Sequence, residues 1–210
     1  MSIPRGALIV FEGCDRAGKS TQVKMLVDAL RKHNIPVERE SFPNRTTPIG
    51  LMINDFLTKK QEYPPETMHL LFSANRWELK DKILRTLNSG TTLIIDRYAA
   101  SGAAYTAATT KRNLAWCREP DRGLPDPDIV IFLDISDGTQ RKRSNWGEER
   151  FENTNLQQSV ASNYKKLVGS TWNVINADEE PSLIHTEILE KVLDTIHKAK
   201  YSPINELYNT

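Results

Sequence analysis

Residues 8–21 read LIVFEGCDRAGKST, in which an apolar run leads directly into the pattern G-x-x-x-x-G-K-S. Gly13 and Gly18 permit backbone conformations that a Cβ would penalise, so successive amide N–H groups can turn inward around a phosphate. Lys19 can then reach the β and γ phosphates of a nucleotide, and the Ser20 hydroxyl can bind Mg²⁺. The stretch therefore predicts a phosphate-binding P-loop between a strand and a helix.

The residues after this loop supply the helix that a P-loop needs. Val23, Leu26, Val27 and Leu30 recur at i, i+3, i+4 and i+7, which predicts an amphipathic helix over 22–33. A helix that begins here points the positive end of its dipole at the bound anion. The alternative is a chance match in an ordinary turn, and the strand before and the helix after argue against it.

Composition limits the class of protein. The chain has 210 residues, which suits one α/β domain over 1–210, and 28 basic against 27 acidic residues give no reason to expect nucleic acid or an acidic membrane as a partner. The sequence has no apolar run of membrane-spanning length and no signal-peptide pattern at its start. Cys14 and Cys117 lack metal-ligand spacing, which favours a reducing compartment. We expect a soluble cytoplasmic protein, with a nuclear location left open.

Four further short segments have the composition of buried parallel strands. They are rich in β-branched and apolar residues and alternate with helical patterns. With the first strand they predict an α/β fold of three layers, a five-stranded parallel sheet flanked by helices, as in P-loop NTPases. Ligands of such sheets gather at the carboxyl ends of the strands. The four segments are 37–42, 92–96, 129–134 and 172–176.

The intervening segments predict helices. One long helix is expected over 65–87 and another over 98–109, where Gly102 suggests the close approach of another group because glycine weakens a helix. Residues 112–127 contain several prolines and predict a loop or a short helix. Two more amphipathic helices are expected over 156–168 and 183–196.

Polar residues follow two of the predicted strands. Phe42 and Arg45 come after the second strand, and Asp96 and Arg97 end the third. Two arginines at neighbouring strand ends can neutralise an acceptor phosphate, as a kinase of a small phosphorylated molecule requires. Each arginine alone would more often form a surface ion pair. Asp96 can hold Mg²⁺, or fix Arg97 in place, or do both.

Two other features bear on the class of enzyme. A GTPase would need a D-x-x-G switch motif and an N-K-x-D motif, whereas the third strand ends in Asp96-Arg97-Tyr98. Residues 139–152 read TQRKRSNWGEERFE and are nearly all polar. Such a segment is usually a solvated surface, but beside a triphosphate it also resembles a closing lid, which we place at about 136–152.

Five motifs occur in order along the chain: G-x-D-R-x-G-K-S-T, F-P-x-R-T, L-L-F-S-A-N-R-W-E, D-R-Y-x-x-S-G and G-L-P-x-P-D. From Arg5 to about Gln157 the chain closely resembles the thymidylate kinases of the eukaryotic type. The resemblance implies ATP- and Mg²⁺-dependent phosphorylation of dTMP to dTDP, for dTTP synthesis, by a homodimer.

The resemblance also implies a donor site. Arg16 would contact the transferred phosphoryl group, and an arginine at this place in the P-loop marks the eukaryotic subtype. Lys19 would cradle the donor phosphates, Arg143 would lie on adenine, and Ser20 and Asp96 would hold the metal. The implied ATP-binding residues are Gly13, Asp15, Arg16, Ala17, Gly18, Lys19, Ser20, Thr21 and Arg143, and the implied catalytic residues are Asp15, Arg16, Lys19 and Arg97.

An acceptor site follows from the same resemblance. Asp15 would hold the sugar 3′-hydroxyl, Phe72 would stack on thymine, and Arg76 would donate to a base carbonyl. On its own Phe72 would be a helix core residue, but its spacing of four from Arg76 places both on one helix face. The implied dTMP-binding residues are Asp15, Phe42, Arg45, Phe72, Arg76, Arg97, Ser101, Gly102, Tyr105 and Gln157.

One position departs from the family pattern, and two other functions stay open. Phe151 stands where the family commonly has tyrosine, so a hydroxyl is lost and the affinity or selectivity for the acceptor is in doubt, although we expect activity to survive. A nucleoside kinase would need a carboxylate base and has less need for paired arginines. A catalytically silent P-loop module is disfavoured because the P-loop residues and Asp96 are intact.

Overall fold

The computed structural model describes residues 4–110, 112–143, 150–151 and 153–209. Five parallel strands form one sheet in the order β2-β3-β1-β4-β5. The predicted ranges of the last three strands are confirmed residue for residue, and the second strand ends one residue earlier than predicted. The strands are β1 (Leu8–Glu12), β2 (Val37–Ser41), β3 (Thr92–Asp96), β4 (Ile129–Asp134) and β5 (Trp172–Asn176).

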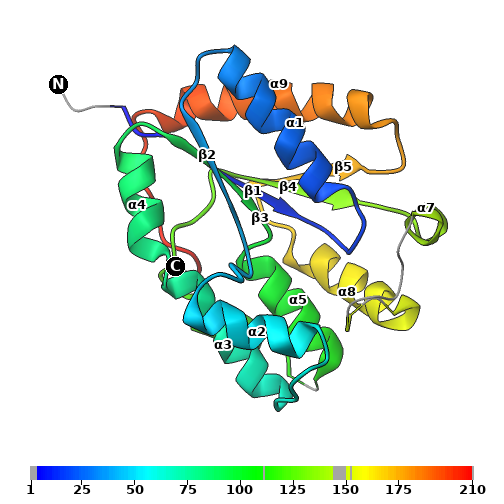
Figure 1. The fold of residues 1–210 in the computed structure, drawn as a ribbon. Coiled ribbons are helices and arrows are strands. Elements are labelled where there is room, and N and C mark those ends of the chain that lie inside the picture. Colours follow the sequence, from blue (N-terminus) through cyan, green and yellow to red (C-terminus); the bar gives the residue numbers. More distant parts are fainter. Residues whose placement is uncertain (1–3, 111, 144–149, 152, 210) are drawn as a thin grey trace.

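Helices cover both faces of the sheet, which confirms the three-layer prediction. In Figure 1, α1 and α9 lie on one face, and α3, α4, α5 and α8 lie on the other. In the described part of the chain, every helix is too short or too polar to span a bilayer. The helices are α1 (Lys19–Lys32), α2 (Pro48–Leu57), α3 (Pro65–Trp77), α4 (Lys80–Asn88), α5 (Ala99–Thr109), α6 (Leu114–Arg118), the 3-10 helix η1 (Glu119–Asp121), α7 (Asp137–Lys142), α8 (Thr154–Leu167) and α9 (Pro181–Ala199).

The core explains why the central strands are apolar throughout. Side chains alternate between the two faces of a strand, so Ile9 and Phe11 of β1 pack in the α1 and α9 layer while Leu8 and Val10 pack in the opposite layer. Every residue of β1 is therefore buried. By contrast β2 pairs only with β3 at the edge of the sheet, and its sequence VERES is correspondingly polar.

The prediction of one helix over 65–87 is wrong, because α3 and α4 are separate helices. The amide of Leu79 bonds to the carbonyl of Arg76, which tightens the chain into a turn. The carboxylate of Glu78 accepts hydrogen bonds from Thr47 at 2.9 Å and from Asn75 at 3.0 Å. These partners include a residue from another part of the chain, so the apolar periodicity of the segment alone could not locate the break.

Helix α2 was absent from the sequence expectations, although a start signal was present. Thr47 is its N-cap and accepts a hydrogen bond from the amide of Gly50 at 3.0 Å, and Pro48 opens the first turn. Ile53 and Phe56 face the interior. The predicted loop or short helix over 112–127 is confirmed, since it contains α6 and η1.

Gly50 gives a test of how closely α2 approaches the preceding turn. A Cβ at this position would lie 1.7 Å from the carbonyl oxygen of Asn44, which is a backbone atom. We expect Gly50→Ala to lower the free energy of unfolding by about 1–3 kcal/mol, because the overlap forces the backbone apart. Urea denaturation measures the change.

Gly138 in α7 provides the matched control. Among the described residues, nothing lies within 4 Å of a Cβ placed there. Gly138→Ala is therefore expected to leave the stability unchanged or to raise it slightly, because alanine favours helix. Equal stabilities of the two variants would contradict the close approach at Gly50.

Candidate active site

Two cavities lie at the carboxyl ends of the strands, where the predicted site residues gather. The first has a volume of about 660 Å³ and is built on the P-loop. The second has a volume of about 540 Å³ and lies among α2, α3 and α5. Five residues belong to the lining of both cavities, so the two cavities meet at one place. The shared residues are Asp15, Phe42, Pro43, Arg45 and Arg97.

The P-loop has the backbone that its glycines predict. Gly13 and Gly18 have φ values of 144° and 95°, in a region that side chains rarely adopt. Lys19 is the first residue of α1, and its Nζ donates to the carbonyl of Cys14 at 2.7 Å. Burial lowers the pKa of Lys19 to about 8, and the nearby charge of Arg97 adds to this effect.

Ser20 and Asp96 are brought together from α1 and the end of β3. The Ser20 hydroxyl donates to Oδ2 of Asp96 at 2.6 Å, and both residues line the first cavity. The guanidinium of Arg97 donates elsewhere, to Gly13 and Ser101 at 3.1 and 3.3 Å and to Asp15. Among the described residues, the hydrogen bonds that orient Arg97 therefore come from Gly13, Ser101 and Asp15, and Asp96 bonds to Ser20 instead.

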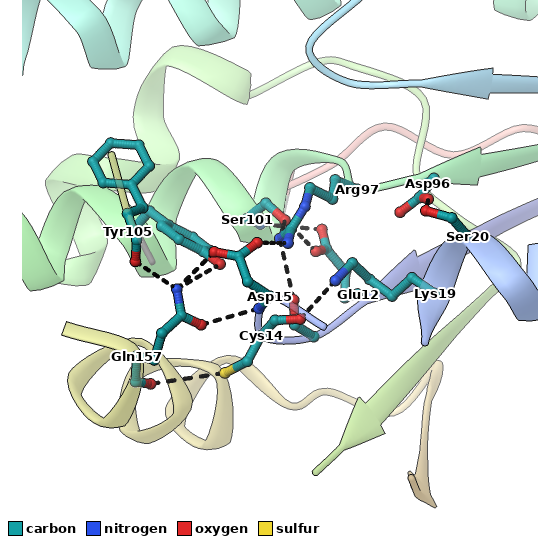
Figure 2. Close-up of polar contacts among 12 residues, drawn as sticks. Glu12, Cys14, Asp15, Lys19, Ser20, Asp96, Arg97, Ser101, Tyr105 and Gln157 are labelled. Carbon is teal, nitrogen blue, oxygen red and sulfur yellow. Dashed lines mark hydrogen bonds and ion pairs between the residues drawn. The ribbon is translucent and has the colours of Figure 1, made fainter. Parts of the chain in front are cut away.

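Asp15 and Arg97 form an ion pair at the junction of the two cavities (Figure 2). The side-chain amide of Gln157 in α8 makes two contacts with Asp15. Its Nε2 donates to the same carboxylate at 2.7 Å, and its Oε1 accepts from the backbone N–H of Asp15 at 3.0 Å. Burial opposes ionisation of Asp15, but the charges of Arg97 and Lys19 outweigh it and lower the pKa. Asp15 is thus held as a carboxylate in a fixed orientation.

The wall of the second cavity contains the residues predicted for the base. Phe72 and Arg76 both line it, together with Ser101, Gly102 and Tyr105. The close approach expected at Gly102 is confirmed, because a Cβ there would lie 2.7 Å from Nη2 of Arg76.

Three neighbouring aromatic side chains, Phe56, Tyr105 and Phe151, also line the second cavity. Phe151 lies between Tyr105 and Phe56, with ring centres 5.5 and 6.1 Å away. Tyr105 in turn packs under the guanidinium of Arg97 at 5.4 Å. The ring of Phe151 is therefore packed between two other aromatic rings.

Arg45 and Arg143 reach the site from different parts of the chain. Arg45 lines both cavities, and its Nη1 donates to Asn54 of α2 at 3.3 Å. Arg143 directly follows α7 and donates to the carbonyl oxygens of Arg16 at 2.5 Å and Ala177 at 3.0 Å. Of the predicted lid over 136–152, residues 144–149 and 152 lie outside the described part of the chain.

Glu12 is a site residue that the sequence reasoning missed. It ends β1 and is fully buried. Its carboxylate accepts from the backbone amides of Tyr98 and Ser101 at 2.9 and 3.1 Å, and from the hydroxyls of Ser101 and Tyr164 at 2.5 and 2.9 Å. Glu12 therefore fixes the start of α5, directly after Arg97.

The signals for the missed residues differ. Glu12 could have been found, because an ionisable residue at the end of an apolar strand needs a buried partner. Asp121, which pairs with Arg76, and Gln140, which donates to the carbonyl of Asp15, leave no local pattern. Their partners lie 45 and 125 residues away in the chain.

The role of Glu12 can be tested by stability. Glu12→Gln replaces an acceptor of several hydrogen bonds with an amide that also carries donors, so buried donors lose their partner. We expect the free energy of unfolding to fall by about 1–3 kcal/mol in urea denaturation. Glu38→Gln on the exposed edge strand is the control and should stay within about 0.5 kcal/mol of the original protein. Similar changes in the two variants would contradict a role for Glu12 in holding α5.

The sequence and the fold are similar to those of known proteins. A family model described as thymidylate kinase matches residues 11–188. Thymidylate kinases of Danio rerio and Homo sapiens are each 42% identical over 211 residues, which cover 99% of this chain and 100% of theirs. A solved structure of thymidylate kinase from Candida albicans superposes with a TM-score of 0.88 at 34% identity, over 96% of this chain and 98% of that one. On its P-loop, its sheet and the full length of these matches, the chain belongs to the thymidylate kinase family.

Proposed function

We propose that the two cavities hold the two substrates of the family's reaction, with ATP in the first and dTMP in the second. In this reaction the γ-phosphoryl group of ATP passes to the phosphate of dTMP and gives dTDP, on the way to dTTP. The observation that carries the assignment is the junction at Asp15, Arg45 and Arg97, which line both cavities. Two polyanions can meet there beside fixed cations.

Positioning and charge supply the catalysis in this proposal. The transfer is in line and needs no covalent enzyme intermediate. Arg16, Lys19 and Arg97 spread positive charge around the phosphoryl group, where charge moves in the transition state. Arg97 is already oriented by Gly13 and Asp15, so little reorganisation is needed when the substrates bind.

The second cavity suits a pyrimidine deoxynucleotide. Phe72 offers a flat face to the base, Arg76 offers donors, and Arg45 and Arg97 face the acceptor phosphate. Asp15 accepts from the sugar 3′-hydroxyl, for which a lowered pKa keeps it ionised at neutral pH. The remaining residues of the proposed acceptor site, which shape or support its walls, are Phe42, Ser101, Gly102, Tyr105 and Gln157.

The residues of the first cavity fit Mg²⁺. Mg²⁺ prefers oxygen ligands and commonly takes one or two protein groups together with phosphate oxygens. The Ser20 hydroxyl and the Asp96 carboxylate are such ligands and lie 2.6 Å apart. Among the described residues no cluster of three acidic, His or Cys side chains competes for the ion. When bound, Mg²⁺ neutralises charge on the donor phosphates.

Four further parts of the proposal concern the whole molecule. Residues 1–210 act as one domain, and residues of about 136–152, which carry Arg143, act as a lid. A homodimer is supported by Leu70 and Trp77 of α3, which are 52% and 38% exposed. A reducing, cytoplasmic location is supported by Cys14 and Cys117, which are both free thiols.

Formation of ADP from ATP and Mg²⁺ tests the assignment directly. We expect strong preference for dTMP over dUMP, UMP, dGMP and thymidine assayed in parallel, because the second cavity offers both phosphate-binding arginines and a pyrimidine site. Turnover of thymidine without turnover of dTMP would show that Arg45 and Arg97 do not bind an acceptor phosphate. No ADP formation with any acceptor would favour a catalytically silent protein.

The pKa of Lys19 predicts a proton linked to nucleotide binding. In the free protein this pKa is about 8, and a bound triphosphate favours the charged amine and raises the pKa. Binding at pH 8.5 should therefore take up a proton, and the affinity should fall as the pH rises through 8. Titration calorimetry with a non-hydrolysable ATP analogue in two buffers of different ionisation enthalpy measures the uptake.

The variant Lys19→Arg is the control for this measurement. Arginine stays protonated throughout this pH range, so the variant should bind the analogue without the extra proton. Identical proton uptake by the two proteins would assign the titration to another group.

A further inference from the structure

The guanidinium of Arg76 is held by a buried carboxylate that lies outside every motif of the sequence. Arg76 lines the second cavity but is only 2% exposed. Its Nε and Nη2 donate to the two oxygens of Asp121 at 3.0 and 2.7 Å. This two-point contact uses one edge of the planar guanidinium and fixes its rotation. Nη1 is left as the nitrogen that does not contact Asp121.

Asp121 is itself fixed by its surroundings. It is fully buried, and the Ser73 hydroxyl of α3 donates to it at 2.7 Å. The same hydroxyl and the indole N–H of Trp77 lie within hydrogen-bond distance of the carbonyl oxygen of Pro120, at 2.9 and 2.7 Å. The η1 helix that carries Asp121 is therefore tied to the helix that carries Arg76.

The C-terminal segment supports η1 from the other side. The amides of Gly123 and Leu207 bond across the two segments, to Leu207 and Leu124 respectively, at 3.0 and 2.7 Å. The amide of Leu124 also bonds to the carbonyl of Asp121 at 3.2 Å. A main-chain frame thus holds the Asp121 carboxylate in place.

Gly102 confines the guanidinium on the α5 side. A Cβ at this position would lie 2.7 Å from Nη2 and 3.3 Å from Nη1 of Arg76. The guanidinium thus packs closely against α5, and the nitrogen nearest to Gly102, Nη2, is also one of the two that donate to Asp121. Contacts on two sides therefore restrict the rotation of the guanidinium. A buried ion pair is weak evidence for added stability, so its fixed geometry is the feature that we consider here.

We propose that Asp121 is a positioning residue for base discrimination, because it holds Arg76 so that the guanidinium donates to the 4-carbonyl of thymine. The inference rests on the proposed function, since it takes the second cavity to hold the base. A guanidinium has donors only. Cytosine carries an amino group at the 4-position, so its N–H would face N–H of Arg76 and both would stay unpaired. An arginine in a fixed orientation therefore rejects cytosine, whereas a mobile guanidinium can rotate away from the 4-amino group and tolerate it.

Asp121→Asn tests the inference with dTMP and dCMP as acceptors. The asparagine has one acceptor oxygen and turns an NH₂ group toward Arg76, so the guanidinium loses its two-point contact. We expect kcat/KM for dTMP to fall roughly 10- to 100-fold, mainly through KM. The ratio of kcat/KM for dTMP over dCMP should fall by at least about tenfold, while KM for ATP stays unchanged.

Glu119→Gln is the matched control. Glu119 lies two residues before Asp121 on the same short helix, but its exposed carboxylate pairs with Arg122. Removing this charge should leave both acceptor constants as they were. The control separates a specific effect on Arg76 from a general loss of negative charge in η1.

Ser73→Ala keeps the inference testable if Asp121→Asn does not fold. The variant removes one donor to Asp121 and leaves the contact with Arg76, so the dTMP to dCMP ratio should fall in the same direction by roughly 2- to 5-fold. In an Arg76→Lys background the ratio should already be low, and adding Asp121→Asn should lower it no further.

Each result has a defined meaning. A dTMP to dCMP ratio that is preserved in Asp121→Asn and Ser73→Ala, with both acceptors weakened equally, would overturn the inference and leave Asp121 a structural residue. The proposed function fails separately, if the original protein forms no ADP in the presence of dTMP. An additive loss in the Arg76→Lys background would show that Asp121 acts through another group.

Discussion

The ion pair between Asp15 and Arg97 is the contact on which the rest of the site depends. It joins the loop after β1 to the turn after β3, which are neighbouring strands of the sheet. Gln157 brings α8 to the same carboxylate, and Ser101 brings α5 to the same guanidinium. Because the pair lies where the two cavities meet, its position sets the distance between a ligand in the first cavity and a ligand in the second.

Basic residues gather around this pair. Arg16, Lys19, Arg45 and Arg97 all line the first cavity, and Asp96 is one of few acidic groups among them. Burial lowers the pKa of Lys19 to about 8, and the nearby charge of Arg97 adds to this effect. An anion bound beside Lys19 would favour its charged form and raise this pKa again.

Two buried carboxylates position parts of the site that line the cavities. Glu12 fixes the start of α5, beside Arg97, and Asp121 fixes Arg76. In both cases hydroxyl donors, Ser101 and Ser73, complete the carboxylate's contacts. Fully satisfied buried networks of this kind are rigid, because any loosening exposes an unpaired charge in a region of low dielectric. The site can therefore present oriented cations before a ligand arrives.

The sequence by itself determined the P-loop, the strands and the order of the layers, because these follow from local backbone demands and from the period of apolar residues. Gly13 and Gly18 are needed for their φ values, and β3, β4 and β5 could be delimited to the residue. It also identified, by resemblance, residues that the fold brings together around two joined cavities. Only the tertiary structure decided where the segment 65–87 divides. It also decided that Asp121 pairs with Arg76 and that Glu12 bonds to the chain next to Arg97. The bond from Arg76 to Asp121 spans 45 residues and that from Tyr98 to Glu12 spans 86, so no local pattern encodes them. They exist because the sheet order makes β1 and β3 neighbours and because η1 packs against α3, and such proximity is a property of the whole fold.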